Sequence, residues 1–234
     1  MRVGSLCRSV TPAHRFGTAA VIGALALGCG GGGGGGTGPG GGATMSKAAP
    51  DGDNQAGRPL DVLTSPLRVK ITDGGLPVVG TTVTWQVVTG GGSVSPTSVA
   101  TDASGIATTT VTLGSSAGEM TIRASASGVS GSPVSFTALV AGATTTVTVG
   151  NNSFSPLVGA VTTGGIVTFA WATGSVNHNI TPDGSNTIPA TTGGNHDAPF
   201  SIDVTFPTAG IFAYHCTVHG SPGGGMHGAI RVVP

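Results

Sequence analysis

Charge is scarce in this sequence. Only 8% of its residues are Asp, Glu, Lys or Arg, about a third of the share that is usual in soluble domains. Three of the nine basic residues are Arg2, Arg8 and Arg15, so the rest of the chain carries more acidic than basic side chains. Nucleic-acid binding needs clustered positive charge, and we therefore expect no nucleic-acid partner.

Patterns that favour helices are also rare. Glycine accounts for 43 residues, and glycine destabilises helix interiors. Short runs rich in Val, Thr and Ile alternate instead with Gly, Pro, Asp and Ser, which is typical of β-sandwiches. The sequence predicts an all-β protein with two sandwiches in tandem, over 57–141 and 144–234. The expected strands are 67–72, 81–88, 105–112, 120–124 and 133–138 in the first sandwich, and 144–149, 166–172, 202–206, 211–216 and 229–233 in the second.

The apolar run near the N-terminus is too short to cross a bilayer as a stable helix. It covers 18–28 and follows Arg2, Arg8 and Arg15, which is the pattern of an export signal. It ends in Ala-Leu-Gly-Cys29, which resembles the lipobox of bacterial lipoproteins. We therefore expect a signal peptide over 1–28 and lipidation of Cys29, with ordinary signal cleavage near this point as the alternative.

Seven glycines follow Cys29 directly, and such a run does not form packed structure. We expect 29–56 to be a Gly-rich tether. Together with the export signal, this predicts a protein of the cell envelope that is held to a membrane by its lipid, in the periplasm or at the cell surface.

Cysteine occurs only three times. Cys7 lies in the expected signal peptide and Cys29 is the expected lipidation site, so Cys216 has no disulfide partner in the mature chain. Three explanations remain for such a thiol in an exported protein: an intermolecular disulfide, an inert buried thiol, or a metal thiolate.

The neighbours of Cys216 favour the metal. His219 follows three residues later, and a glycine-rich turn then leads to Met226. A thiolate, an imidazole and a thioether together favour copper over zinc or magnesium. We expect the second imidazole to come from His178, in a short polar turn after the strand that contains Trp171.

The other side chains of this region have different expected roles. His215 precedes Cys216 on the same strand, so alternation places it on the opposite face, at the surface. His196 lies in a polar loop and is expected to be solvated. His227 adjoins Met226 and is an alternative ligand, whereas Tyr214 shares the face of Cys216 and is expected in the core.

Part of the first sandwich resembles a known family. The stretches PLRVKITDGGLPVVGTTVTWQVVTGGGSVSP and TDASGIATTTVTLGSSAG are similar to bacterial Ig-like domains of the invasin and intimin type. The resemblance implies an Ig-like sandwich over 57–141. It assigns no chemistry, because such modules act as spacers, stalks and adhesins without a fixed site.

The second sandwich resembles another family. The stretches VNHNITPDG and FAYHCTVHGSPGGGMHGAIRV are similar to plastocyanin-type cupredoxins, which implies a Greek-key sandwich over 144–234 with one type 1 (blue) copper ion. In this resemblance the imidazole ligands fall on His178 and His219, the thiolate on Cys216 and the weak axial thioether on Met226. Asn179 falls on the residue that braces the ligand loop. Six residues separate His219 from Met226, where plastocyanin has four.

The function that follows is electron transfer, with copper cycling between Cu(II) and Cu(I) and with redox proteins as partners of a monomeric carrier. Asp183 and Asp197 are isolated in expected loops, and neither paired carboxylates nor a Ser-His-Asp pattern is present, so we do not expect an enzyme. Two alternatives remain open. One is a copper carrier or scavenger that uses the same ligands, and the other is an Ig-like structural or adhesion protein with a secondary copper site.

Overall fold

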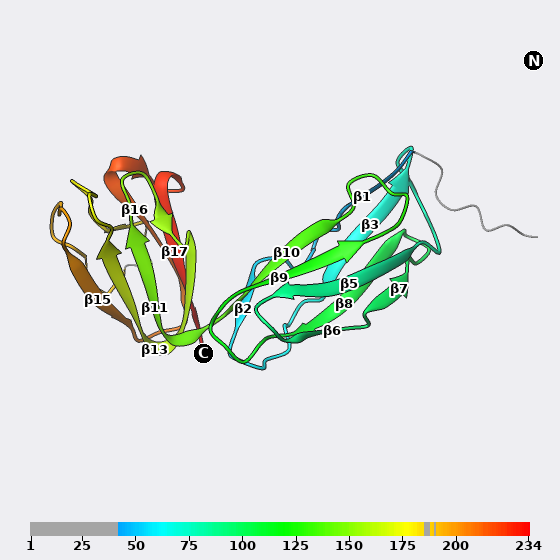
Figure 1. Ribbon diagram of the computed structural model, residues 1–234, viewed down its shortest axis with the longest axis horizontal. Helices are drawn as coiled ribbons and strands as arrows, with labels where there is room; N and C mark the ends of the chain where they lie inside the picture. Colours follow the sequence, from blue (N-terminus) through cyan, green and yellow to red (C-terminus); the bar gives the residue numbers. More distant parts are fainter. Residues whose placement is uncertain (1–41, 185–187, 190) are drawn as a thin grey trace, which may run out of the picture. The chain divides into compact units, whose positions relative to one another are not determined.

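The computed structural model describes residues 42–184, 188–189 and 191–234 (Figure 1). The expected signal peptide, the lipidation site Cys29 and the first part of the expected tether lie outside these residues. The described residues form strands and turns without any helix, so the all-β prediction is confirmed. Within this part of the chain, no segment forms a helix that could span a membrane.

The first sandwich packs two five-stranded sheets against each other. One sheet has the order β1-β3-β8-β6 with β4 paired to β3, and the other has the order β2-β10-β9-β5-β7. Alternation places Val83 and Trp85 in the core and their neighbours outside, as a half-buried strand requires. The strands are β1 Ala43–Lys47, β2 Gln55–Gly57, β3 Leu67–Asp73, β4 Leu76–Pro77, β5 Thr82–Thr89, β6 Ser93–Ser95, β7 Ser98–Ala100, β8 Ile106–Thr112, β9 Gly118–Ser125 and β10 Val134–Val140.

The first sandwich begins earlier than the expected boundary at residue 57. β1 pairs antiparallel with β3, and β2 pairs parallel with β10. Ala43 and Met45 point into the core. The pattern of 43–57 did not predict this because its two strands are short, and because its Pro, Gly and Asp residues resemble a linker. Because β1 and β2 pair with distant strands, the segment 43–57 belongs to the first sandwich.

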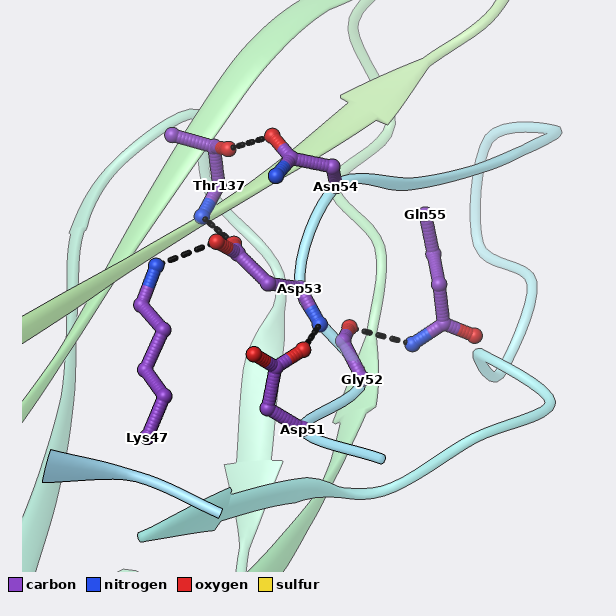
Figure 2. Close-up of polar contacts among 7 residues, drawn as sticks. All are labelled: Lys47, Asp51, Gly52, Asp53, Asn54, Gln55 and Thr137. Atoms are coloured by element: carbon purple, nitrogen blue, oxygen red, sulfur yellow. Dashed lines mark hydrogen bonds and ion pairs between the residues drawn. The ribbon is translucent and has the colours of Figure 1, made fainter. Parts of the chain in front are cut away.

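Figure 2 shows how the segment between β1 and β2 is held. Asp53 pairs with Lys47 and also accepts a hydrogen bond of 2.8 Å from the backbone N–H of Thr137 on β10. The hydroxyl of Thr137 lies 2.6 Å from Oδ1 of Asn54, and the N–H of Asp53 donates to Asp51 at 3.0 Å. These contacts make the end of the expected tether part of the sandwich.

The second sandwich is built from seven strands in the order β12-β11-β13-β17-β16-β14, with β15 paired to β13. The long strand β13 begins at Val158, before the expected start at residue 166. Its first part pairs with β17 and its second part pairs with β11 and β15. Gly164, with a φ of 81°, lies between the two parts in a conformation that glycine favours. The strands are β11 Gly142–Val149, β12 Phe154–Ser155, β13 Val158–Trp171, β14 Thr181–Pro182, β15 Ser201–Phe206, β16 Gly210–Ser221 and β17 Gly224–Val233.

Each sandwich has its own buried cluster. The first cluster contains Trp85 and Phe136, whose ring centroids are 5.7 Å apart. In the second cluster, Tyr214 packs edge-on against Phe154 and Phe169, with centroid distances of 4.9 and 5.2 Å. Cys216 and Met226 belong to this second cluster, so two of the four expected metal ligands are part of the core.

Candidate metal centre

The hairpin of β16 and β17 carries most of the expected ligands, and it is irregular at that point. The pairs His215–His227 and Gly220–Gly225 are in register, whereas residues 216–219 lie opposite Met226 alone. Such a bulge turns side chains away from their regular alternation. A Cβ atom on Gly220 would lie only 2.5 Å from the carbonyl oxygen of Met226. The absence of a side chain there permits the two strands to approach.

The structure brings His178 together with Cys216 and His219. The Sγ atom of Cys216 lies 3.7 Å from Nδ1 of His178 and 3.7 Å from Nδ1 of His219. The three donor atoms all lie within 4.8 Å of one another. His178 and Cys216 are completely buried, and His219 is exposed. Two segments that are 38 residues apart in the sequence therefore meet at one point.

Met226 lies in the same buried cluster as Cys216 and is 1% exposed. It stands opposite the bulge that contains Cys216 and His219. Its place at the inner side of the bulge is compatible with the expected fourth donor. Its role as a ligand stays a prediction.

The turn that carries His178 is held by His196. The two residues form a β-bridge with backbone hydrogen bonds of 3.0 and 2.8 Å. The ring of His196 stacks on Phe200 with a centroid distance of 3.7 Å, and its carbonyl accepts a hydrogen bond of 3.0 Å from the indole N–H of Trp171. The expectation that His196 is merely solvated was wrong. The loop pattern did not predict that it pairs with the His178 turn.

Asn179 connects the two halves of the site. Its Oδ1 accepts a hydrogen bond of 3.0 Å from the backbone N–H of Thr217, and its Nδ2 donates to the hydroxyl of Thr217 at 2.7 Å. Nδ2 also donates to Asn195 at 2.6 Å. Because Asn179 adjoins His178 and Thr217 adjoins Cys216, these bonds fix the spacing of the two donors. The bracing role implied by the resemblance stays a prediction for the metal-bound protein.

Sequence reasoning missed Asn151, in the turn between β11 and β12. Its Oδ1 lies 3.4 Å from Nε2 of His178 and accepts a hydrogen bond of 3.1 Å from the backbone N–H of Val176. An amide oxygen accepts, so we assign the ring proton of His178 to Nε2 and the lone pair to Nδ1, which faces Cys216. Turns rich in Asn are common, and nothing in the sequence singles out this one.

His215 differs from its expected setting. It lies on the face opposite to the core, as alternation predicts, but it is only 8% exposed and its Nδ1 pairs with Oδ1 of Asp183. The backbone N–H of Asp183 also donates to the carbonyl of Ala213 at 2.9 Å. The expectation that Asp183 is isolated was wrong, because β14 pairs with β16 and places Asp183 beside His215.

Electrostatics favour the neutral form of His178. Burial lowers the pKa of His178, the neighbouring His219 lowers it further, and Asp197 acts in the opposite direction. Metal ions bind the neutral imidazole. The ring is therefore in its metal-binding form at neutral pH.

The donor set itself limits which ion fits. A thiol and two imidazole nitrogens, closely grouped and half enclosed by an apolar core, suit copper in both of its common oxidation states. A nearby thioether would add a soft donor that hard cations do not use. The residues present therefore fit a single copper ion.

No family model matches the sequence, and no curated protein matches it. Among solved structures, the reduced Cu(I) form of an amicyanin mutant is 26% identical with a TM-score of 0.32, over 40% of this chain and 85% of its own. A mutant plastocyanin of fern is 24% identical with a TM-score of 0.32, over 38% of this chain and 99% of its own. The D00-D0 domain of intimin is 16% identical with a TM-score of 0.34, over 43% of this chain and 46% of its own.

The chain is thus similar over parts of its length to cupredoxins and to an Ig-like protein. Scores of this size do not assign it to either family.

Proposed function

We propose that this protein binds one copper ion through His178, Cys216 and His219, with Met226 as a weak axial ligand, and that it carries single electrons between redox proteins. The observation that supports this most is the grouping of three donor atoms from two distant segments within 4.8 Å. Bound copper would supply one-electron exchange between Cu(II) and Cu(I). The proposal includes no substrate-turnover step.

The task of the protein residues is to hold the donors still. Asn179 links the His178 turn to the Cys216 strand, and His196 closes the same turn from the other side. Donors that are already positioned need little movement when the charge of the ion changes. The exposed His219 leaves one edge of the site within reach of a partner protein.

We propose further that the protein works at the cell envelope as a monomer, attached to the membrane through a lipid on Cys29. The Ig-like sandwich would then act as a spacer for the copper domain. The supporting observation is the sequence before Cys29, in which three arginines precede an apolar run. Mass analysis of the N-terminus of the native protein tests this, and a mature chain without a lipidated Cys29 would contradict it.

Copper titration tests the proposed site. Adding Cu(II) to the full chain should produce the intense visible absorption of a copper thiolate, and Cys216→Ser should abolish it. Cys29→Ser is the matched control when both variants are made as unlipidated full chains, since it then removes a thiol outside the site, and it should keep the full absorption. A colourless copper complex of the parent protein would contradict the proposal.

Redox cycling separates electron transfer from copper transport. An electron carrier should be reduced and reoxidised repeatedly with its absorption restored each time and without loss of metal to a chelator. Copper loss in each reduced phase would instead favour a copper carrier that uses the same ligands.

A further inference from the structure

A second pair of imidazoles lies on the other face of the ligand hairpin. His215 on β16 and His227 on β17 are directly opposite each other in the antiparallel register. Directly opposed residues project from the same face, with Cβ atoms about 4.5–5.5 Å apart. This is the face away from the core, because Tyr214 and Cys216, on either side of His215, are both buried in the second cluster. The proposed copper site uses neither ring.

Both rings have an acceptor beside Nδ1, which leaves Nε2 as the nitrogen that could bind a ligand. Nδ1 of His215 is paired with the carboxylate of Asp183, and Nδ1 of His227 lies 2.9 Å from the carbonyl oxygen of Gly225. Each partner is an acceptor, so the proton of each neutral ring lies on Nδ1 and the lone pair on Nε2. Among the described residues, neither Nε2 has a hydrogen-bond partner.

This arrangement is the one that prepares a histidine for metal binding. A carboxylate or carbonyl on the second nitrogen fixes the tautomer and the ring orientation, and it raises the basicity of the metal-binding nitrogen. Asp183 does this for His215 and the Gly225 carbonyl does it for His227. His215 is nearly buried and His227 is partly exposed, so an ion would enter from the side of His227.

We propose that His215 and His227 bind a second divalent cation, Cu(II) or Zn(II), through their Nε2 atoms, with Asp183 as a positioning residue. Imidazole ligands suit these ions better than Mg(II), Ca(II) or Mn(II). Among the described residues, the only group of three close His, Cys, Asp or Glu donors is the one around Cys216. The second site therefore has two protein ligands, water completes its coordination, and its ion exchanges readily.

The first experiment counts bound Zn(II) by calorimetric titration of the full chain. His227→Gln should bind one ion fewer than the parent, and Asp183→Asn should bind the second ion about 10–100-fold more weakly. Ala229→Ser, two residues along β17 on the same face, is the matched control and should keep both ions. Equal stoichiometry in the parent and in His227→Gln would overturn the proposal.

A second measurement makes the result independent of the proposed copper site. In the double variant His178→Gln/His219→Gln, one Zn(II) should still bind, and nitrogen NMR should show the Nε2 resonances of His215 and His227 shifting together. If only one of these two rings responds to Zn(II), the pair does not bind one ion and the inference fails. Loss of the copper thiolate absorption in this double variant concerns the first site alone.

Discussion

At the residue scale, a few polar side chains set the spacing of the proposed copper ligands. The side chain of Asn179 makes four hydrogen bonds, including one that its Oδ1 accepts from the hydroxyl of Thr181 at 3.2 Å, while the residue is 7% exposed. These bonds replace the water contacts that the side chain would otherwise make. Buried polar groups cost free energy when they lose a partner. The side chain therefore stabilises the site through the contacts that it completes.

Truncating Asn179 tests this. Asn179→Ala removes all four hydrogen bonds and leaves the Thr217 N–H without its side-chain acceptor, so the free energy of unfolding of the metal-free protein should fall by about 1–3 kcal/mol. Asn195→Ala removes only one of the four and should cost clearly less. Urea denaturation compares the two variants, and equal losses would argue against a bridging role for Asn179.

The lowered pKa of His178 predicts a pH dependence. Burial and His219 hold the pKa of this ring below its ordinary value of 6.5 in the folded state, so the unfolded chain binds more protons near this pH. The metal-free protein should therefore lose stability as the pH falls below about 6.5. Urea midpoints at about pH 5 and pH 7.5 measure the change. His178→Gln should reduce it, and an unchanged pH dependence in that variant would assign it to other groups.

At the scale of the elements, the irregular hairpin of β16 and β17 determines where three of the proposed copper ligands lie. The bulge in β16 places Cys216 and His219 opposite Met226, and the close approach of the strands depends on Gly220. An expected glycine-rich turn is in fact a nearly continuous hairpin, because backbone pairing between β16 and β17 resumes beyond His219.

Adding one methyl group to the hairpin tests the role of this approach. Gly220→Ala would place a Cβ atom 2.5 Å from the carbonyl oxygen of Met226, and overpacking of this kind costs about 1–3 kcal/mol. Gly224→Ala meets only the Ser221 hydroxyl at 3.4 Å and should be tolerated. We expect weaker copper thiolate absorption from Gly220→Ala alone. Equal absorption in both variants would show that the spacing is not critical.

Many of the strands and the donors of the ligand hairpin could be predicted from the sequence, because their signals lie within short segments. Alternation over 67–72 and 81–88 indicates which face of each strand is buried, and the donor chemistry of Cys216 and His219 is visible within four residues. The rest depends on distant pairing. The β-bridge between His178 and His196 and the pairing of His215 with Asp183 follow from registers that no local pattern contains.

At the scale of the whole molecule, the two sandwiches bury separate clusters with no residue in common. The proposed copper ligands draw on the second cluster only. Each module is therefore expected to contribute its own unfolding step, and damage to one core should leave the other intact.

Large-to-small substitutions in each core test this independence. Trp85→Ala should destabilise the first sandwich by about 3–5 kcal/mol and leave the copper absorption unchanged. Phe169→Ala, which removes a ring packed on Tyr214, should destabilise the second sandwich by a similar amount and lower the temperature at which the absorption is lost. Calorimetric scans follow both transitions. A single transition that shifts equally in both variants would contradict independent cores.

The complete burial of Cys216 should also protect the metal-free chain from oxidation. In the proposed envelope location, thiols are prone to stray disulfide formation. A sulfur beneath the sheet surface is closed to other proteins and to bulky oxidants, while the exposed ring of His219 leaves a path that a single ion can follow. The burial of Cys216 should therefore keep the metal-free protein reduced and still leave copper an entry route at His219.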